Sequence, residues 1–205
     1  MSEHVVSEHG VSVKVTVVPA EFTLVQYEAA EIAEVAADVA DTIGFPDGTE
    51  VRVEVDETSP LGKTEVVAID PVTVAIESGA FEDAKRPRHL SERSVRSVLG
   101  RLLFRARDRL DPSFADAPPD DDLPLREHVA WDVYAVGRCE RLGWRVQKER
   151  RRYHFRIRHG FTDVADEAFD RLWAADGLTW ADLKAVCNET EAADVRAAVK
   201  RGRGR

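Results

Sequence analysis

The segment SERSVRSVLGRLLFRARDRLDP, residues 91–112, carries a regular apolar pattern. Its apolar side chains recur at intervals of three, four and seven residues, as on a helix that buries one face. They are Val95, Val98, Leu99, Leu102, Leu103, Ala106 and Leu110. Ser91 is a suitable N-cap, and Asp111-Pro112 ends the pattern. The segment therefore predicts a long helix that packs in the core of the protein.

Two arginines lie one turn apart on another face of this helix. Arg101 and Arg105 are i,i+4 neighbours, and two like charges at this spacing cost about 0.2–0.5 kcal/mol in an exposed helix. If the helix is packed on both sides, each guanidinium needs a carboxylate or another anion as a partner. The sequence leaves open whether the pair faces water or a buried partner.

The chain before residue 91 predicts a sheet and another helix. Four segments have the alternation or the composition of strands: residues 11–17, 51–55, 65–69 and 72–76. Apolar residues recur at helical spacing from 23 to 43, and Gly44 and Pro46 end that helix. This β-α-β-β-β order predicts a sheet of three or four strands over residues 11–77, with the helix packed on one face.

The chain after residue 112 predicts three further helices and a basic segment. The helices span residues 125–142 and lie near 163–174 and 179–188, and residues 145–158 suggest a basic hairpin or extended arm. The class is α+β: a small, mainly antiparallel or mixed sheet with one packed helix, two central helices and a small C-terminal extension. The predicted parts are a flexible tail 1–10, an α+β domain 11–143, the arm with two short helices 144–190, and a basic tail 191–205.

Charge is distributed unevenly along the chain. The formal net charge is −9, yet residues 1–90 hold 18 acidic and six basic residues, whereas residues 145–160 hold seven basic residues and a single acid, Glu149. Overall acidity disfavours general nucleic-acid binding. The basic segment still favours a local site for an anion.

Neither a membrane span nor an export signal is evident in the sequence. The apolar stretches are too short to cross a bilayer, and the N-terminus lacks the apolar core of a signal peptide. We therefore expect a cytoplasmic protein without a membrane partner. Cys139 and Cys187 are expected to be free thiols.

Common catalytic motifs are missing from the sequence. It contains no glycine-rich phosphate loop, no CxxC pair, no GxSxG elbow and no HExxH. His128 and Asp132 share a helix face, but zinc sites usually need three or four ligands. His4 becomes the third residue if Met1 is removed, and could then bind Cu(II) or Ni(II). We expect no cofactor and no metal in the core; His128, Asp132 and His4 are the remaining metal candidates.

The segment 145–159 interleaves cations with aromatic rings. Its candidate binding residues are Arg150, Arg151, Arg152, Tyr153, Phe155, Arg156 and Arg158. A strand of this composition could lie along phosphates while its rings stack on bases. It could instead neutralise acids of residues 1–90, or Asp120 to Asp122, within the same protein. The second interpretation is favoured because residues 1–90 are so acidic.

The order of elements over residues 11–143 resembles that of the compact zincin-like metallopeptidases. Residues 99–112 are similar to their metal-binding helix, in which HELLH runs into a downstream Leu-Asp-Pro, and residues 129–138 are similar to the helix that follows. On this pattern Arg101 and Arg105 stand where the zinc histidines would be. Leu102 stands where the glutamate base would be.

The resemblance implies a zincin-like fold whose activity has been lost. Arginine stays charged and cannot ligate zinc, and Leu102 cannot accept a proton from water. It also implies that Arg101 and Arg105 point toward the helix 125–142, where Asp132, together with Glu127 or a carboxylate from the early strands, would pair with them.

The leading hypothesis is a catalytically inactive zincin-like protein that serves as an interaction or regulatory module for an unknown protein partner. The first alternative is a nucleic-acid- or phosphate-binding protein that uses residues 145–159. The second alternative is a metallohydrolase with an atypical metal site.

Overall fold

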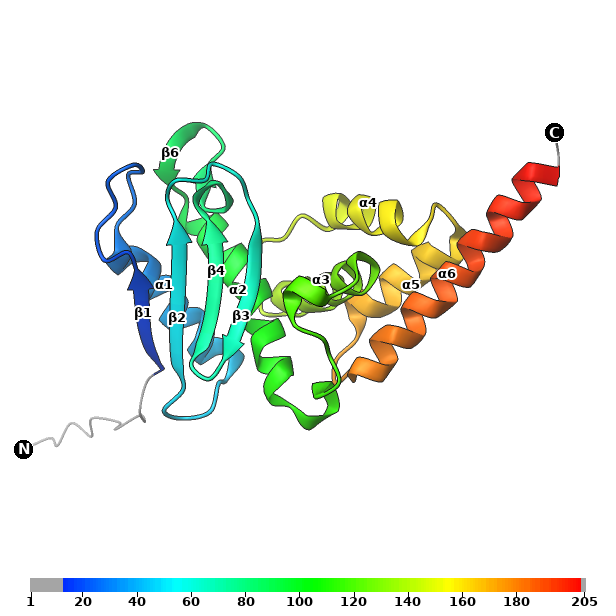
Figure 1. Cartoon of the computed structure of the whole chain (residues 1–205), viewed down its shortest axis with the longest axis horizontal. Coiled ribbons are helices and arrows are strands. Elements are labelled where there is room, and N and C mark those ends of the chain that lie inside the picture. The colour runs from blue at the N-terminus through cyan, green and yellow to red at the C-terminus, as the bar shows by residue number, and fades with distance from the viewer. Residues whose placement is uncertain (1–12, 204–205) are drawn as a thin grey trace, which may run out of the picture.

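A four-stranded mixed sheet forms one half of the molecule (Figure 1). The computed structural model describes residues 13–203, with side chains up to residue 200. The strands are β1 (Lys14–Val18), β2 (Glu50–Asp56), β3 (Thr64–Ile69) and β4 (Val72–Glu77), in the order β1-β2-β4-β3. The pairs β1–β2 and β2–β4 are parallel, whereas β3–β4 is antiparallel. The predicted β-α-β-β-β order is confirmed.

The alternation of side chains in β2 explains why the sheet has one buried face. Val51, Val53 and Val55 are buried, while Arg52 and Glu54 between them remain partly exposed. Helix α1 (Ala29–Ile43) crosses from β1 to the parallel strand β2 and packs on the valine face. It ends at Gly44, whose φ of 79° is readily adopted only by glycine.

Helix α1 begins later than its apolar pattern predicts. Residues 23–28 are not helical, because the backbone N–H of Gln26 donates to the carbonyl of Arg88 at 2.7 Å and Gln26 forms a β-bridge with His89. Pairing with another part of the chain thus replaces the first helical turns. The predicted helix start at residue 23 is wrong by about six residues.

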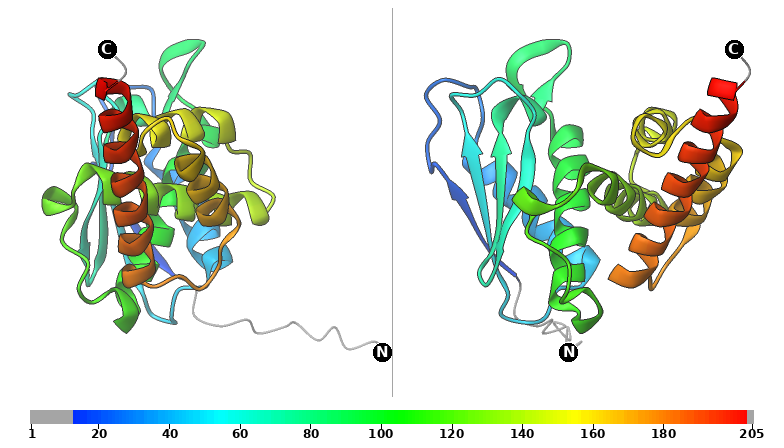
Figure 2. Two further views of the ribbon diagram at one scale, coloured as in Figure 1. Left: turned by 90° about the vertical axis from the view of Figure 1, so that its right-hand side faces the viewer. Right: turned by 45° about the vertical axis from the view of Figure 1, so that its right-hand side comes forward.

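Helix α2 (Glu92–Leu110) lies beside α1 on the same face of the sheet, and no described helix covers the other face (Figure 2). Ser91 caps it as predicted, since its Oγ accepts from the backbone N–H of Ser94 at 3.2 Å. The segment before it holds a 3-10 turn, η1 (Ser78–Ala80), and a short hairpin of β5 (Glu82–Asp83) and β6 (Arg86–Leu90).

Four helices form the other half of the molecule. They are α3 (Leu125–Arg141), α4 (Lys148–His159), α5 (Asp163–Ala174) and α6 (Trp180–Arg203). Two 3-10 turns, η2 (Pro112–Phe114) and η3 (Asp120–Asp122), lead from α2 to α3. Helix α3 contributes to both hydrophobic cores, because Ala135 and Cys139 pack with the sheet while Ala130 and Val133 pack with the helices. The predicted domain boundary after residue 143 stays a prediction.

The basic segment 145–158 is a helix over most of its length, so the predicted hairpin or extended arm is wrong. Helix α4 has Glu149 in its first turn and Arg156 and Arg158 in its last, which suits the helix dipole. Phe155 and His159 are one turn apart and fully buried, with their rings stacked at 3.8 Å. The helical period brings Phe155 and His159 onto one inward face, which packs on neighbouring helices.

The C-terminal helix is also longer than predicted. Helix α6 runs to Arg203 instead of ending near residue 188, so most of the predicted basic tail 191–205 is helical. Residues 191–200 are rich in alanine, a strong helix former, which favours continuation of the helix. The predicted tail 1–10, including His4, lies outside the described residues.

Two further expectations concern membranes and thiols. None of the helices described here is long and apolar enough to cross a membrane. Cys139 and Cys187 are both free and buried, as predicted. Burial raises the pKa of each thiol to about 12, which keeps both in the neutral form.

Buried His159 should make the stability of the protein depend on pH. Burial lowers its pKa to about 4, whereas an unfolded histidine titrates near pH 6.5. Between these values the unfolded chain binds a proton that the folded chain does not, so stability is lost as the pH falls. We expect the free energy of unfolding to drop by about 2–3 kcal/mol from pH 7 to pH 4.5.

Urea unfolding of the wild type and of His159→Gln at the two pH values measures this effect. Glutamine can still hydrogen-bond to the carbonyl of Arg126, which lies 3.0 Å from Nε2 of His159, but it does not titrate. The variant should therefore lose less stability on acidification. An equal loss in both proteins would assign the effect to other groups.

Candidate functional site

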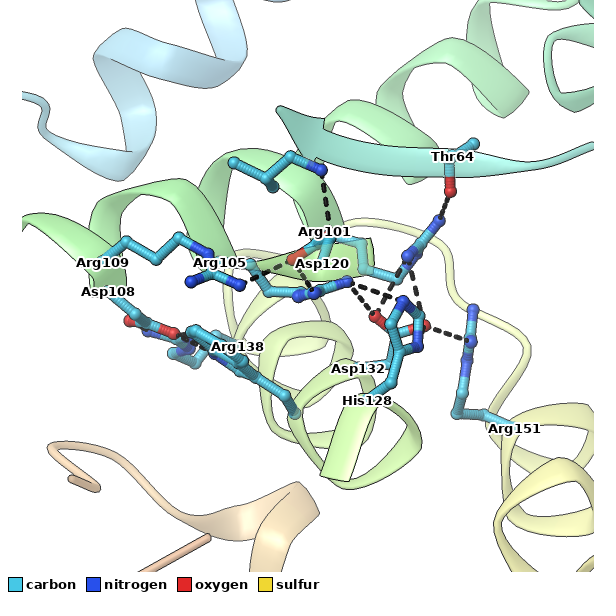
Figure 3. A network of polar contacts seen from close by, with 12 residues as sticks. Thr64, Arg101, Arg105, Asp108, Arg109, Asp120, His128, Asp132, Arg138 and Arg151 are labelled. Atoms are coloured by element: carbon cyan, nitrogen blue, oxygen red, sulfur yellow. Dashed lines mark hydrogen bonds and ion pairs between the residues drawn. The ribbon is translucent and has the colours of Figure 1, made fainter. Parts of the chain in front are cut away.

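Arg101 and Arg105 of α2 face α3 across a buried interface (Figure 3). Nη1 of Arg101 donates to both carboxylate oxygens of Asp132, at 3.0 and 3.1 Å. Nη1 of Arg105 lies 3.4 Å from Oδ1 of the same carboxylate. The predicted pairing of both arginines with Asp132 is therefore present, and the alternative of an exposed pair is wrong.

The second carboxylate of the site is Asp120, which the sequence did not assign to this role. Its Oδ1 lies 2.6 Å from Nη2 of Arg105 and 2.7 Å from Nη2 of Arg109. Its Oδ2 accepts the backbone N–H of Val66 at 2.8 Å and so occupies part of the free edge of β3. Glu127, one of the partners predicted for the arginines, makes no ion pair within the described residues, so that prediction is wrong. Asp120 is brought in by the loop between α2 and α3.

Thr64 and Arg151 complete the set of polar side chains around Asp132. Nη2 of Arg101 donates to Oγ1 of Thr64 at the start of β3, at 2.6 Å. Nη1 of Arg151, on α4, lies 3.2 Å from Oδ2 of Asp132. The network thus joins the sheet, α2, α3 and α4. We call this set of side chains the arginine–aspartate network: Thr64, Arg101, Arg105, Arg109, Asp120, His128, Asp132 and Arg151.

The network keeps Asp132 ionised despite its burial. Burial alone would raise the pKa of this carboxyl, but the nearby guanidiniums of Arg101, Arg105 and Arg151 outweigh it and hold the pKa well below its usual range. Burial lowers the pKa of Arg105, an effect that Asp132 and Asp120 partly offset. A guanidinium nevertheless stays protonated in proteins. All of these charges are therefore present at neutral pH.

His128 belongs to the network as a hydrogen-bond acceptor. Its Nε2 lies 3.1 Å from Nη1 of Arg105, which can only donate, so Nε2 acts as the acceptor of a neutral ring. Burial lowers the pKa of His128, and the repulsion from Arg105 and Arg101 opposes the attraction of Asp132. Its Nδ1 is 4.0 Å from Oδ2 of Asp132, which is too long for a direct hydrogen bond.

A second buried pair lies next to the network. Arg138 of α3 donates to both oxygens of Asp108 at 2.7 and 2.6 Å, and Nε1 of Trp131 donates to Oδ2 of Asp108 at 2.7 Å. The guanidinium of Arg138 also stacks on Tyr134, 3.9 Å from the ring centroid. All these side chains are buried. Asp108 is therefore used for structure and is not free for chemistry.

The arginines of the basic segment find their acids in the C-terminal half. Arg152 pairs with Asp170 at 2.5 Å and Arg156 pairs with Asp166 at 2.6 Å, both on α5. The partners predicted for Arg152 and Arg156, in residues 1–90 or at Asp120 to Asp122, are therefore wrong. The same prediction is wrong for Arg151, which pairs with Asp132 instead. Antiparallel packing of α4 and α5 explains the choice, because it brings facing turns of the two helices together.

The remaining candidates of the basic segment divide into buried and exposed residues. Phe155 is fully buried and cannot stack on a base. Tyr153 is 58% exposed, and Arg150 and Arg158 are exposed. Neither arginine has a carboxylate within ion-pair distance in the described part of the chain.

His128 and Asp132 do not come together with other metal ligands. Within residues 13–200 there is no group of three or more histidine, cysteine, aspartate or glutamate side chains that could hold a metal ion. His128 and Asp132 are instead surrounded by guanidiniums, which repel cations. The arrangement can fix charge and bind an anion, but it has no free carboxylate for base catalysis.

No family model, no curated protein and no solved structure matches this chain. Its function is therefore inferred from its own residues and their geometry.

Proposed function

We propose that this chain is a catalytically inactive zincin-like protein that acts as an interaction or regulatory module. The observation that carries the proposal is the position of Arg101 and Arg105, which share one helix face and both reach Asp132 on the following helix. In an active zincin the corresponding positions would carry zinc ligands. Here they carry cations, and Leu102 between them is fully buried and apolar.

The zincin-like ancestry can be tested by restoring ligands. Arg101→His together with Arg105→His places two imidazoles on the helix face that already meets His128 and Asp132. Removing two guanidiniums also leaves Arg109 and Arg151 against two carboxylates, so the charges balance. We expect this double variant of the full chain to bind about one zinc per molecule.

Elemental analysis and a competition titration with a chromophoric chelator measure the zinc. His4→Ala and His9→Ala are included in both the double variant and its parent, because the N-terminal histidines could themselves bind metal. The parent should contain no stoichiometric zinc. A folded double variant without zinc, or a parent with one zinc per chain, would contradict the proposed ancestry.

The outer face of α4 is the surface that best fits a partner. Its exposed side chains follow i, i+3, i+4, i+7, i+8 spacing along one side of the helix, and the ring of Phe161 folds back to 6.3 Å from that of Tyr153. We call this surface the α4 face; it consists of Arg150, Tyr153, His154, Ile157, Arg158 and Phe161. Tyr153, Ile157 and Phe161 are 58%, 50% and 65% exposed. Aromatic residues flanked by arginine are typical of the centre of protein interfaces.

Charge indicates what kind of partner the α4 face would bind. Arg150 and Arg158 stand at its two ends, with no acid of the described chain paired to either. Two copies of the face would bring these guanidiniums together, which disfavours self-association. We therefore propose a protein partner that presents an apolar ridge flanked by carboxylates.

Nucleic-acid binding remains the second candidate and has less support. Three of the predicted phosphate-binding arginines are paired with Asp132, Asp166 and Asp170. The affinity of a protein for nucleic acid depends on how many phosphates its lysines and arginines neutralise, and the α4 face offers two free guanidiniums. The face therefore provides too few cations to follow a nucleic-acid backbone.

A pair of matched variants tests the α4 face. Ile157→Glu adds an acid in its centre, whereas Val67→Glu adds the same acid at a similarly exposed site on β3, 57% exposed. A partner isolated from the native host is purified and titrated against both variants. We expect it to bind Val67→Glu like the wild type and Ile157→Glu about 30-fold or more weakly. Equal binding to both variants, or recovery of RNA that salt releases, would contradict a protein-binding α4 face.

A further inference from the structure

The arginine–aspartate network contains more positive than negative charge. Four guanidiniums meet two carboxylates: Arg101, Arg105, Arg109 and Arg151 against Asp120 and Asp132. Four positive and two negative charges leave a formal surplus of two. His128 is a neutral acceptor for Arg105 and offsets none of it. Ion-pair partners for the surplus are not found elsewhere among the described side chains.

Burial makes this surplus unfavourable. Arg105 is fully buried, and the side chains of Arg101 and Arg109 are each 10% exposed. The Nε atoms of Arg105 and Arg109 are buried and have no hydrogen-bond acceptor. Carbonyl oxygens of Ala117 and Pro118 accept from Arg109, but they carry only partial charge. A buried cation without a full counter-charge strongly destabilises a protein.

The network is open to solvent on the side of Arg151 and His128. Their side chains are 30% and 25% exposed, whereas Arg105 and Asp120 are closed off behind them. Arg151 uses only Nη1 toward Asp132, so its Nε and Nη2 have no acceptor in the described part of the protein. Figure 3 shows this guanidinium at the margin of the network, beside the imidazole. An anion from solvent would meet these free donors first.

We propose that the open side of the network, at Arg151 and His128, binds one phosphate group. The planar fork of a guanidinium matches two oxygens of a tetrahedral oxyanion. The double negative charge of phosphate equals the surplus of the network. Arg101 and Arg105 behind Asp132 add to the attraction without touching the ligand. Phosphate could enter as the inorganic ion or as a group on a larger molecule.

Isothermal titration of the full chain with inorganic phosphate, at constant ionic strength set by sodium chloride, tests the site. We expect one phosphate per chain. Arg151→Gln should weaken binding about tenfold or more, because it removes one charge-assisted fork. Arg150→Gln is the matched control, because Arg150 is next to Arg151 on α4 but lies on the exposed side of the helix. The affinity of this variant for phosphate should stay within about twofold of that of the wild type.

A second titration with O-phosphoserine distinguishes the source of the phosphate. Comparable binding of both ligands indicates a site that accepts a phosphate group on a larger molecule. Binding of inorganic phosphate alone indicates that the site has no room for the rest of a larger molecule. Should Arg151→Gln fail to fold, Arg151→Lys takes its place. It keeps the charge but loses the planar fork, so the broadening of the phosphorus resonance that the wild type causes should weaken. Absence of binding to the wild type, or equal weakening by Arg150→Gln and Arg151→Gln, would overturn the proposal.

Discussion

Replacement of Asp132 by alanine is expected to lower the free energy of unfolding by about 3–5 kcal/mol. Asp132 is only 4% exposed and receives ion pairs from Arg101, Arg105 and Arg151. Its removal leaves Arg101 without any carboxylate and raises the formal surplus of the network from two charges to three. Urea unfolding at pH 7, with the slope of the transition compared between proteins, measures the loss.

Asp170→Ala is the matched control for this experiment. Asp170 also pairs with an arginine of α4, Arg152 at 2.5 Å, but its side chain is 56% exposed. An exposed pair contributes at most about 1 kcal/mol. If Asp132→Ala destabilises the protein no more than Asp170→Ala does, the network is not a buried charge cluster on which the fold depends.

Replacement of Trp131 by alanine should have an effect of similar size, about 3–5 kcal/mol. The indole is fully buried between the network and the helical core. It stacks on Phe114 at 5.1 Å and lies 5.4 Å from Trp180. The guanidinium of Arg105 lies 5.1 Å from its ring centroid. Alanine would leave a cavity in the helical core and remove an aromatic face from a buried cation.

Trp131→Phe separates packing from hydrogen bonding at this position. Phenylalanine keeps an aromatic ring but loses the N–H that donates to Asp108 at 2.7 Å. Asp108 retains both bonds from Arg138, so we expect a loss of about 1–2 kcal/mol. The same urea unfolding applies to both variants. Equal losses in Trp131→Phe and Trp131→Ala would show that the hydrogen bond, and not the ring, accounts for the effect.

These two residues connect the halves of the molecule. Asp132 links α3 to α2 and α4, and Trp131 packs between the network and α6. A zinc ion in the same place would join α2 to α3 in a comparable way. The ion pairs of Asp132 with Arg101 and Arg105 provide this link between α3 and α2.

Local pattern alone determined several parts of this fold. The valines of β2 alternate with polar residues, and the apolar stripe of α2 follows the helical period, so both elements could be predicted without knowing their neighbours. The pairing of Arg101 and Arg105 with Asp132 needed more than local pattern: the zincin resemblance supplied the neighbouring helix, and helical phase then selected Asp132 on it. The acidity of residues 1–90 was visible too, but the expectation that it would serve as the counter-charge for α4 was wrong.

Only the tertiary structure decided the rest. Asp120 reaches Arg105 because the loop between α2 and α3 folds against the edge of β3. No periodicity in the sequence predicts where such a loop folds. By composition alone, residues 145–158 resemble a solvated basic strand. They form a helix because α5 and α6 cover Phe155 and His159 on one side of it. Arg152 and Arg156 pair with α5 because charge attraction acts between side chains that packing has already brought close. Long-range contacts of this kind are set by the three-dimensional path of the chain, whereas periodicity reports only on which face of an element is buried.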